Sequence, residues 1–562
     1  MHRSRLPLIA LVTICLLGSP ALALARDIFV STTGKDSNSG NSPEQALRTI
    51  AAASDKAAAG DTIHLLPGRY NEAIKPTRSG SSGKPIVYRS YGPTPAILTH
   101  SSKNGLEEAI SIHGRSYIVV DGIDVDGVKP GPNASVKYFV RVKDSQNVTV
   151  RGGSFKYANG YFGVLIDGTS KHVILEDNTI DFVGRYDNGA DKNSDDGDLV
   201  TVAKTTSHVL IQRNVMRHGP HNVLSVGGRY CVVQDNYLDN SYRDVLGGDT
   251  GGRVGAFWGQ DGVFQRNYVT GSGASSDSNT NSLLKVEGTN NIVRMNVFAY
   301  GHFVGILTES GSWSPTSILG RIYNNTFYRL GSGAWLMRFY DGGKDIGRYV
   351  FANNLIIDSR MKPPSSPTDV DLSFNVAALG KGPTAESRIF NNIIHPANGK
   401  APVVLLSDAG GTMSLDQVHS RHAQLFSGNL ISRTQFASAS PAKVADFDLA
   451  SGSEAIDKGA FLTRVVGSGE SNQIKVADSR FFTNGYGVIP GDTIQLEGST
   501  VRARVTSVDH SSGTLKLDTA IAFRDGQGIA LAYEGSAPDI GAMEYGKGGS
   551  GLPSAPANLR IE

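Results

Sequence analysis

One short pattern recurs along the middle of the chain: a β-branched run leads into an asparagine and then into further apolar residues. Clear copies are "HVILEDNTI", "HVLIQRNVM", "YCVVQDNYL" and "YVFANNLII". The aligned asparagines are Asn178, Asn214, Asn236, Asn267, Asn296, Asn325, Asn354 and Asn392. Their spacings of 36, 22, 31, 29, 29, 29 and 38 residues are typical of coils that share a minimum length and carry insertions of varying size. The pattern therefore predicts a solenoid.

A stacked β-solenoid explains why one asparagine returns in every coil. Each coil turns sharply between strands, and asparagine tolerates the left-handed conformation of tight turns. Its side-chain amide can also hydrogen-bond to the asparagine of the next coil, while alternate strand residues fill a shared core. The 66 glycines and three tryptophans agree with a turn-rich all-β protein. A β-sandwich with coincidental asparagine turns is the alternative, but eight occurrences at one strand position favour the solenoid.

The first 25 residues have the pattern of a signal peptide. "MHRSRL" is a basic start, "PLIALVTICLLG" is an apolar run, and residues 23–25 form a small-x-small cleavage site. We therefore expect a secreted or periplasmic protein with no membrane partner. Loss of Arg3 and Arg5 lowers Lys+Arg from 54 to 52, which equals the 52 Asp+Glu, so the neutral mature chain argues against a nucleic-acid partner. We expect a monomer that keeps Cys231 as its single cysteine.

Residues 27–70 predict a strand, a loop, an amphipathic helix and a second strand. Ser42 is the expected N-cap, with Pro43 at the first helical position and Gly60 after the helix. This segment resembles the N-terminal cap of pectate-lyase-like proteins, in which "VS..G.DSN.G....A..TI..A...A..GDTI.L..G.Y" recurs. The resemblance implies a right-handed parallel β-helix over about residues 27–440, and it implies no particular activity.

Two segments near the C-terminus look like halves of a closing motif, "SGSEAIDKG" (451–459) and "SAPDIGAMEY" (536–545). Short alternating strands between them predict a small β-barrel inserted at 461–535, which is either a passive cap or a carbohydrate-binding module. The expected organisation is thus a signal peptide (1–25), a capped β-helix (26–460), the barrel (461–535), a closing segment (536–545) and a flexible tail (546–562).

Six predicted strands lie at similar distances before the asparagines and should share one sheet: 198–204, 221–227, 253–259, 281–288, 303–309 and 334–340. Since stacked strands are about 4.8 Å apart, residues distant in sequence come within catalytic reach. The outward-facing candidates are Lys204, Ser225, Lys285, Glu287, Glu309 and Arg338, with His218 and His221 at a turn. The short coil from Asn214 to Asn236 lies between two longer ones, as a cleft floor between walls.

This set suits β-elimination on an acidic polysaccharide. The reaction needs a cation to neutralise the uronate carboxylate, a base to remove the acidified proton, and an acid to protonate the leaving oxygen. We expect Asp195, Asp196 and Asp198 to hold Ca²⁺ through carboxylate oxygens. Candidate catalytic residues are Lys204 or His221 as the base and Arg217 and His218 as carboxylate-binding groups or the acid, with Lys285 as a further catalytic candidate. Candidate substrate-binding residues are Arg253, Glu287, Glu309 and Arg338.

"DLVTVAKTTSHVLIQRNVM" resembles the catalytic-lysine coil of alginate-lyase and chondroitinase-B-type enzymes, "E.IS.KS..N.Y..NTF", and "MRHG" is similar to their "LRHG". The resemblance implies a polysaccharide lyase with Lys204 as the base. Here Asp198 stands where those enzymes have glutamate, and "MRHG" follows Asn214 directly.

The same stretch also resembles the polygalacturonase-type pattern "DD", "GHG", "RIK". That resemblance implies a glycoside hydrolase using Asp195 and Asp196, with His218 and Lys285, because paired carboxylates suit inverting hydrolysis. The "NTD" expected one coil earlier is missing. A non-catalytic glycan-binding protein and a uronate epimerase are further alternatives, and the sequence does not name the polymer.

Overall fold

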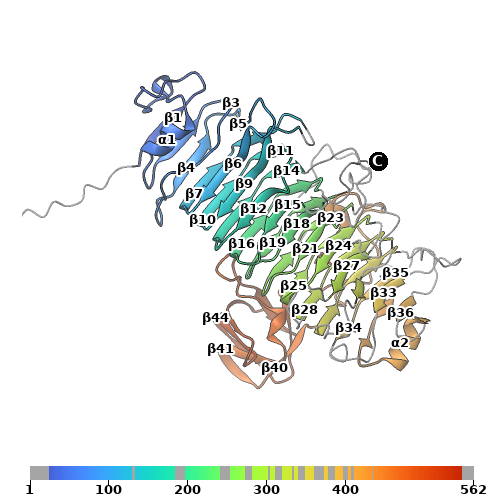
Figure 1. The fold of residues 1–562 in the computed structure, drawn as a ribbon. Helices are drawn as coiled ribbons and strands as arrows, with labels where there is room; N and C mark the ends of the chain where they lie inside the picture. Colours follow the sequence, from blue (N-terminus) through green and yellow to red (C-terminus); the bar gives the residue numbers. More distant parts are fainter. Residues whose placement is uncertain are drawn as a thin grey trace, which may run out of the picture.

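The computed structural model describes residues 25–129, 133–183, 197–219, 221–240, 253–271, 282–301, 304–309, 319–331, 335–338, 348–359, 372–376, 387–395, 403–406, 411–432 and 434–546. Most of these residues form a right-handed parallel β-helix (Figure 1). A typical coil contributes one strand to each of three parallel rows, which we call sheets 1, 2 and 3. None of the helices in these described ranges has the length and apolar character that crossing a membrane requires.

Sheet 1 is a continuous row of 14 strands. In spatial order these are β1 (Asp27–Val30), β2 (Thr62–Leu65), β4 (Ile86–Ser90), β7 (Ser116–Asp121), β10 (Gln146–Arg151), β13 (Lys171–Glu176), β16 (Ser207–Gln212), β19 (Val232–Gln234), β22 (Val263–Gln265), β25 (Thr289–Arg294), β28 (Leu319–Tyr323), β31 (Arg348–Ala352), β34 (Arg388–Phe390) and β38 (Phe426–Ser427).

Sheet 2 follows sheet 1 in each coil. Its strands are β3 (Gly68–Tyr70), β5 (Ala96–Leu98), β8 (Asp124–Asp126), β11 (Ser154–Ala158), β14 (Thr179–Val183), β17 (Val215–Arg217), β20 (Tyr237–Asp239), β23 (Tyr268–Thr270), β26 (Val297–Ala299), β29 (Thr326–Tyr328), β32 (Leu355–Ile357), β35 (Ile393–His395) and β39 (Leu430–Ile431).

Sheet 3 completes the coil and contains all six strands that the sequence placed together. Its strands are β6 (Leu106–His113), β9 (Val136–Lys143), β12 (Phe162–Asp167), β15 (Asp198–Val202), β18 (Asn222–Val226), β21 (Gly255–Phe257), β24 (Ser282–Val286), β27 (Val304–Glu309), β30 (Trp335–Arg338), β33 (Leu372–Val376) and β36 (Val403–Leu406), with β37 (Gly411–Ser414) antiparallel to β36.

The predicted asparagine ladder is confirmed. Each side-chain amide donates to the side-chain oxygen of the asparagine one coil further, over Nδ2–Oδ1 distances of 2.7–3.1 Å, and Asn429 adds a ninth member. The expectation that these asparagines adopt the left-handed conformation is wrong. The preceding residue does so, as at Arg213 (φ 54°) and Asp235 (φ 57°). This arrangement leaves the asparagine N–H groups for the ladder, as from Asn214 to Asn236 Oδ1 at 3.0 Å.

The N-terminal cap differs from the single predicted helix. Ser42 caps only a 3₁₀ turn (Pro43–Gln45), and α1 (Ile50–Lys56) begins after its own N-cap, Thr49. Two contacts break the helix between them. Leu47 bridges strand β1 at Val30, and the Asp36 carboxylate accepts hydrogen bonds from the N–H groups of Arg48 and Thr49, both at 2.9 Å.

The predicted barrel is an antiparallel closed sheet of β40 (Thr463–Val466), β41 (Gly469–Val476), β42 (Thr493–Leu496), β43 (Arg502–Asp509), β44 (Thr514–Phe523) and β45 (Gly528–Leu531). It packs against the outer face of sheet 1, below β25 and β28 in Figure 1. The segments before and after it meet: the Asp457 N–H donates to Asp539 at 2.7 Å, and the Ser536 N–H donates to Asp457 at 2.8 Å. A second short helix, α2 (Leu415–Arg421), lies near the last coils.

Candidate active site

The candidate site lies at the corner where sheet 2 passes into sheet 3. In the coil of β17 and β18 this connection is only residues 218–221, because β17 ends at Arg217 and β18 begins at Asn222. At the same corner the neighbouring coils carry long connections, residues 184–197 between β14 and β15 and residues 240–254 between β20 and β21. The short connection thus lies between two long insertions, as the coil lengths predicted.

His218 is held by a carboxylate and an aromatic ring from the preceding coil. Its Nδ1 makes a very short contact with Asp181 Oδ1, and its ring stacks on Phe182 with centroids 4.2 Å apart. Arg217 donates from Nη2 to the other oxygen of Asp181 at 2.6 Å. A neutral histidine that donates from Nδ1 to a carboxylate carries its lone pair on Nε2. The arrangement therefore equips His218 to accept a proton at Nε2.

His221 lies three residues later and has a different set of neighbours. Its Nδ1 is 2.8 Å from Asn222 Nδ2 and 3.2 Å from Asp198 Oδ1. The amide of Asn222 also donates to Asp198 at 2.7 Å. These contacts admit two tautomers: an Nδ1–H would donate to Asp198, whereas an acceptor Nδ1 would take the Asn222 amide proton and leave the ring proton on Nε2. The side chain is 31% exposed. In the second tautomer His221 can donate a proton from Nε2.

Lys285 and Glu287 form a close pair further along sheet 3. The Lys285 Nζ is 2.6 Å from Glu287 Oε1, and both side chains are largely buried, at 13% and 5% exposed. Lys285 is in register with Ser225 through Ala256 of β21, three residues beyond the start of β18. At about 3.3 Å per residue, this pair lies about 10 Å along the sheet from the Asn222 level.

Lys204 is placed away from the two histidines. Strand β15 ends at Val202, two residues earlier than predicted, and Lys204 is exposed in the following turn. It follows the end of β15 opposite to Asp198, and the strand alone separates Asp198 from Val202 by about 13 Å. The structure therefore brings His218, His221 and Arg217 to one corner and does not bring Lys204 there.

The remaining candidates are only partly described. Arg253 comes just before β21, and its buried Nε has no hydrogen-bond partner. Glu309 and Arg338 are register partners on β27 and β30. Asp195 and Asp196 lie outside the described residues. Asp198 accepts hydrogen bonds at Oδ1 from Asn222 and at Oδ2 from Thr201, and the described residues contain no cluster of three or more acidic, histidine or cysteine side chains suited to a metal. Calcium binding stays a prediction.

Sequence reasoning missed Asp181, although a signal for it exists. Asp181, Arg217 and Asp239 each follow a ladder asparagine by three residues, and the structure places them in register on β14, β17 and β20. If the coils are aligned by their ladder asparagines, the position three residues later holds an aspartate in the coil before Arg217 and in the coil after it. A histidine oriented by one of these aspartates could then have been sought next to Arg217.

The chain matches known proteins only over short segments or at low identity. No protein-family model matches it. A segment of 156 residues is 29% identical to the uncharacterized protein YwoF of Bacillus subtilis and covers 27% of this chain and 28% of YwoF. A segment of 70 residues is 41% identical to pectate lyase PEL9 of Emericella nidulans and covers 12% of this chain and 17% of PEL9. The matched segments thus span less than a third of either relative.

Solved structures resemble the chain over longer stretches. Pectate lyase Pel9A is 14% identical with a TM-score of 0.43, and the match covers 93% of this chain and 98% of Pel9A. An alginate lyase from Paenibacillus sp. FPU-7 is 15% identical with a TM-score of 0.37, covering 57% of this chain and 97% of that enzyme. The strand pairing of the chain itself shows a parallel β-helix fold. Since one fold hosts many reactions, its chemistry must be argued from the corner residues.

Proposed function

We propose that the chain is a secreted polysaccharide lyase that cleaves a uronate-containing polymer by β-elimination, with His218 as the base. The observation that carries the proposal is the His218–Asp181 pair beside Arg217, at a short connection between two long ones. The pair fixes the imidazole through Nδ1, and the chain between the strands is long in the coils on both sides of His218. Pectate lyase PEL9, the relative with a named activity, supports the same class of substrate.

The proposed step needs three groups. Nε2 of His218 takes the proton on the carbon next to the uronate carboxylate, and the electron pair of that C–H bond forms a double bond to the neighbouring carbon. The glycosidic C–O bond on that carbon breaks, and His221 Nε2 gives its proton to the leaving oxygen. Arg253 provides positive charge for the carboxylate, which acidifies the proton that His218 removes, while Arg217 stays paired with Asp181 and helps to hold it against His218. No step requires Lys204.

Hydrolysis would use the site differently. An inverting hydrolase needs one carboxylate to activate water and another to protonate the leaving group. Asp181 and Asp198 at the corner accept hydrogen bonds from neighbouring side chains, and Asp239, in register with Arg217, accepts one from the Tyr237 hydroxyl at 3.4 Å. These contacts favour orienting roles, so the hydrolase alternative relies on Asp195 and Asp196.

The test incubates the mature protein with alginates, pectates and glycosaminoglycans and follows the ultraviolet absorbance of the unsaturated product, with and without a chelator. A rise on one polymer supports the lyase, and its loss under chelation supports a calcium site at residues 195–198. New reducing ends without absorbance indicate hydrolysis. His218→Gln should abolish the signal, whereas His113→Gln should not. His113 is a matched control, because it also contacts a carboxylate, Glu108 at 3.0 Å, on strand β6.

A further inference from the structure

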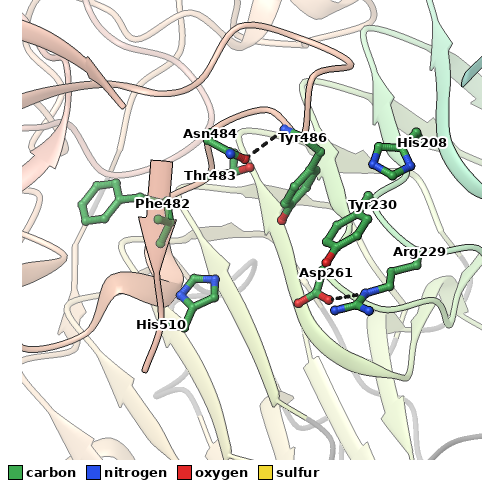
Figure 2. A pocket seen from close by; sticks show the side chains of 10 residues that line it. His208, Arg229, Tyr230, Asp261, Phe482, Thr483, Asn484, Tyr486 and His510 are labelled. Atoms are coloured by element: carbon green, nitrogen blue, oxygen red, sulfur yellow. Dashed lines mark hydrogen bonds and ion pairs between the residues drawn. The ribbon is translucent and has the colours of Figure 1, made fainter. Parts of the chain in front are cut away.

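A cleft lies where the barrel meets the sheet 1 side of the solenoid (Figure 2). Its volume is about 370 Å³, within the usual range of small-molecule sites of about 300–1,000 Å³. The solenoid contributes residues near the starts of sheet 1 strands, and the barrel contributes the loop after Phe481 and the end of β43. None of these residues belongs to the proposed lyase site.

The solenoid wall is a row of side chains on three successive coils. His208, Tyr230 and Asp261 occupy the same corner position, as the bridges between Ser207, Arg229 and Gln260 show. All three have left-handed backbones, with φ of 55°, 58° and 52°. The rings of His208 and Tyr230 are 5.1 Å apart, close to the coil repeat of about 4.8 Å. The solenoid thus presents an imidazole, a phenol and a carboxylate in a row along its axis.

The barrel wall faces this row with further aromatic and polar groups. Tyr486 reaches Tyr230, with ring centroids 5.0 Å apart, and Thr483, Asn484 and His510 line the rest of the cleft (Figure 2). The loop that carries Tyr486 is tied to Asp492, which accepts the Thr483 N–H at 2.9 Å. Asp492 also pairs with Arg294 of the solenoid at 2.5 Å. Both walls are therefore held in place before any ligand arrives.

The cleft is polar and electrically balanced. Arg229 and Asp261 are its charged lining residues, and they pair at 2.9 Å. Desolvation lowers the pKa of His208 and of His510 from the ordinary value, so both imidazoles are neutral near pH 7. The buried Nδ1 of His208 has no hydrogen-bond partner. Such a set of hydroxyl, amide and imidazole groups beside aromatic rings suits a ligand with many hydroxyls and no net charge.

We propose that this cleft is an ancillary glycan-binding site that takes a neutral sugar unit, separate from the site for the uronate polymer. A uronate would need an unbalanced cation, and the guanidinium of Arg229 is already paired. The inference gives the inserted barrel a binding role in place of a passive capping role. It does not rest on the lyase activity, because neutral sugars lack the carboxylate that β-elimination requires.

The test is calorimetric titration of the full-length chain with neutral gluco-, manno-, xylo- and galacto-oligosaccharides and with uronate oligosaccharides. We expect binding of a neutral class that weakens at least tenfold in His208→Leu, which removes an imidazole from the cleft wall, and in Val508→Trp, which fills the cleft. His64→Leu should bind as the natural protein does. His64 is the matched control, because its Nδ1 is also buried without a partner and it lies outside the cleft.

Three results would overturn the inference: no binding of any neutral oligosaccharide at millimolar concentration, unchanged affinity in both cleft variants, or preferential binding of uronates that the cleft variants abolish. His218→Gln separates the two sites. It should leave neutral-sugar binding intact while removing lyase activity, so failure of one proposal is distinguishable from failure of the other. Thermal unfolding of each variant is the control for folding, because it distinguishes a lost binding site from a lost fold.

Discussion

Arg294 of the solenoid and Asp492 of the barrel form an ion pair at 2.5 Å, although 198 residues separate them in sequence. Both side chains are almost completely buried, at 3% and 7% exposed. Arg294 also donates to Gln265 Oε1 and to the hydroxyl of Tyr323, both at 2.9 Å, so its charge is surrounded by acceptors. The barrel is therefore joined to sheet 1 by a buried polar contact as well as by apolar packing.

Arg294→Met should destabilise the protein by about 3–5 kcal/mol, because it leaves the carboxylate of Asp492 buried without its cation. The double variant Arg294→Met, Asp492→Leu should recover much of that loss, since no buried charge remains. The measurement is chemical denaturation of both variants. Arg464→Met is the control: its partner Glu497 is 3.1 Å away in an exposed pair worth under about 1 kcal/mol. Equal effects at the buried and exposed pairs would contradict this account.

Asn267→Ala should cost about 3 kcal/mol or more, because each buried polar group left without a partner costs about 1–3 kcal/mol. The Asn267 amide donates to Val233 O, Gln265 O and Asn296 Oδ1 at 3.0–3.1 Å, and its oxygen accepts from Asn236. Urea denaturation measures the loss. Asn41→Ala is the control, because Asn41 is exposed in the N-terminal cap of the solenoid. It should change the free energy of unfolding by under about 0.5 kcal/mol. A comparable loss at Asn41 would contradict a special role for the ladder.

The solenoid was predictable because its determinant repeats within the sequence. A buried asparagine needs partners above and below, so its spacing records the coil length directly, and the ladder from Asn178 to Asn392 followed from that spacing. The N-terminal helix was not predictable in the same way. Its start depends on the contacts of Leu47 with Val30 and of Asp36 with Thr49, which local propensity and capping residues do not encode.

The candidate site was predictable in position but only partly in its members. Strand spacing brought His218 and His221 to one corner. The placement of Lys204 failed because Ala203 accepts hydrogen bonds from the N–H and hydroxyl of Thr206, which turns the chain before Lys204 can continue the strand. Asp181 was missed because its role depends on a partner 37 residues away. Such contacts depend on the exact residue at which a strand ends, and the alternation of apolar and polar residues does not define strand ends to one residue.

The free energy of unfolding should fall in acid because Asp478, at the junction of the barrel and the solenoid, becomes protonated. Burial alone would raise the pKa of this carboxyl, but Arg321 and Arg480 outweigh burial and hold the pKa below its ordinary value. The unfolded chain therefore takes up a proton at a higher pH, near about 3.9, than the folded protein does. The stabilisation is present above that pH and is lost as the pH falls through the folded pKa. Between about pH 4 and 2, the natural protein should lose stability more steeply than Asp478→Asn. Parallel slopes for the two proteins would contradict the assignment.

The two histidines of the corner should respond differently to substitution. His218→Gln removes the base, and loss of a general base lowers the rate by about 10²–10⁴-fold. His221→Gln removes the proton donor to the leaving oxygen. The loss of rate in His221→Gln should therefore be smaller on substrates with a better leaving group, whereas the loss of rate in His218→Gln should not change.

Asp181→Asn tests the orienting carboxylate. It keeps the size of the side chain but no longer compels His218 to donate from Nδ1, so kcat should fall while substrate affinity is retained. Added imidazole should restore part of the activity of His218→Gly and none of that of Asp181→Asn, in which the histidine still fills the site. Full activity in His218→Gln, with elimination products still formed, would assign the base to another residue, and Lys285 would be the next candidate at this sheet.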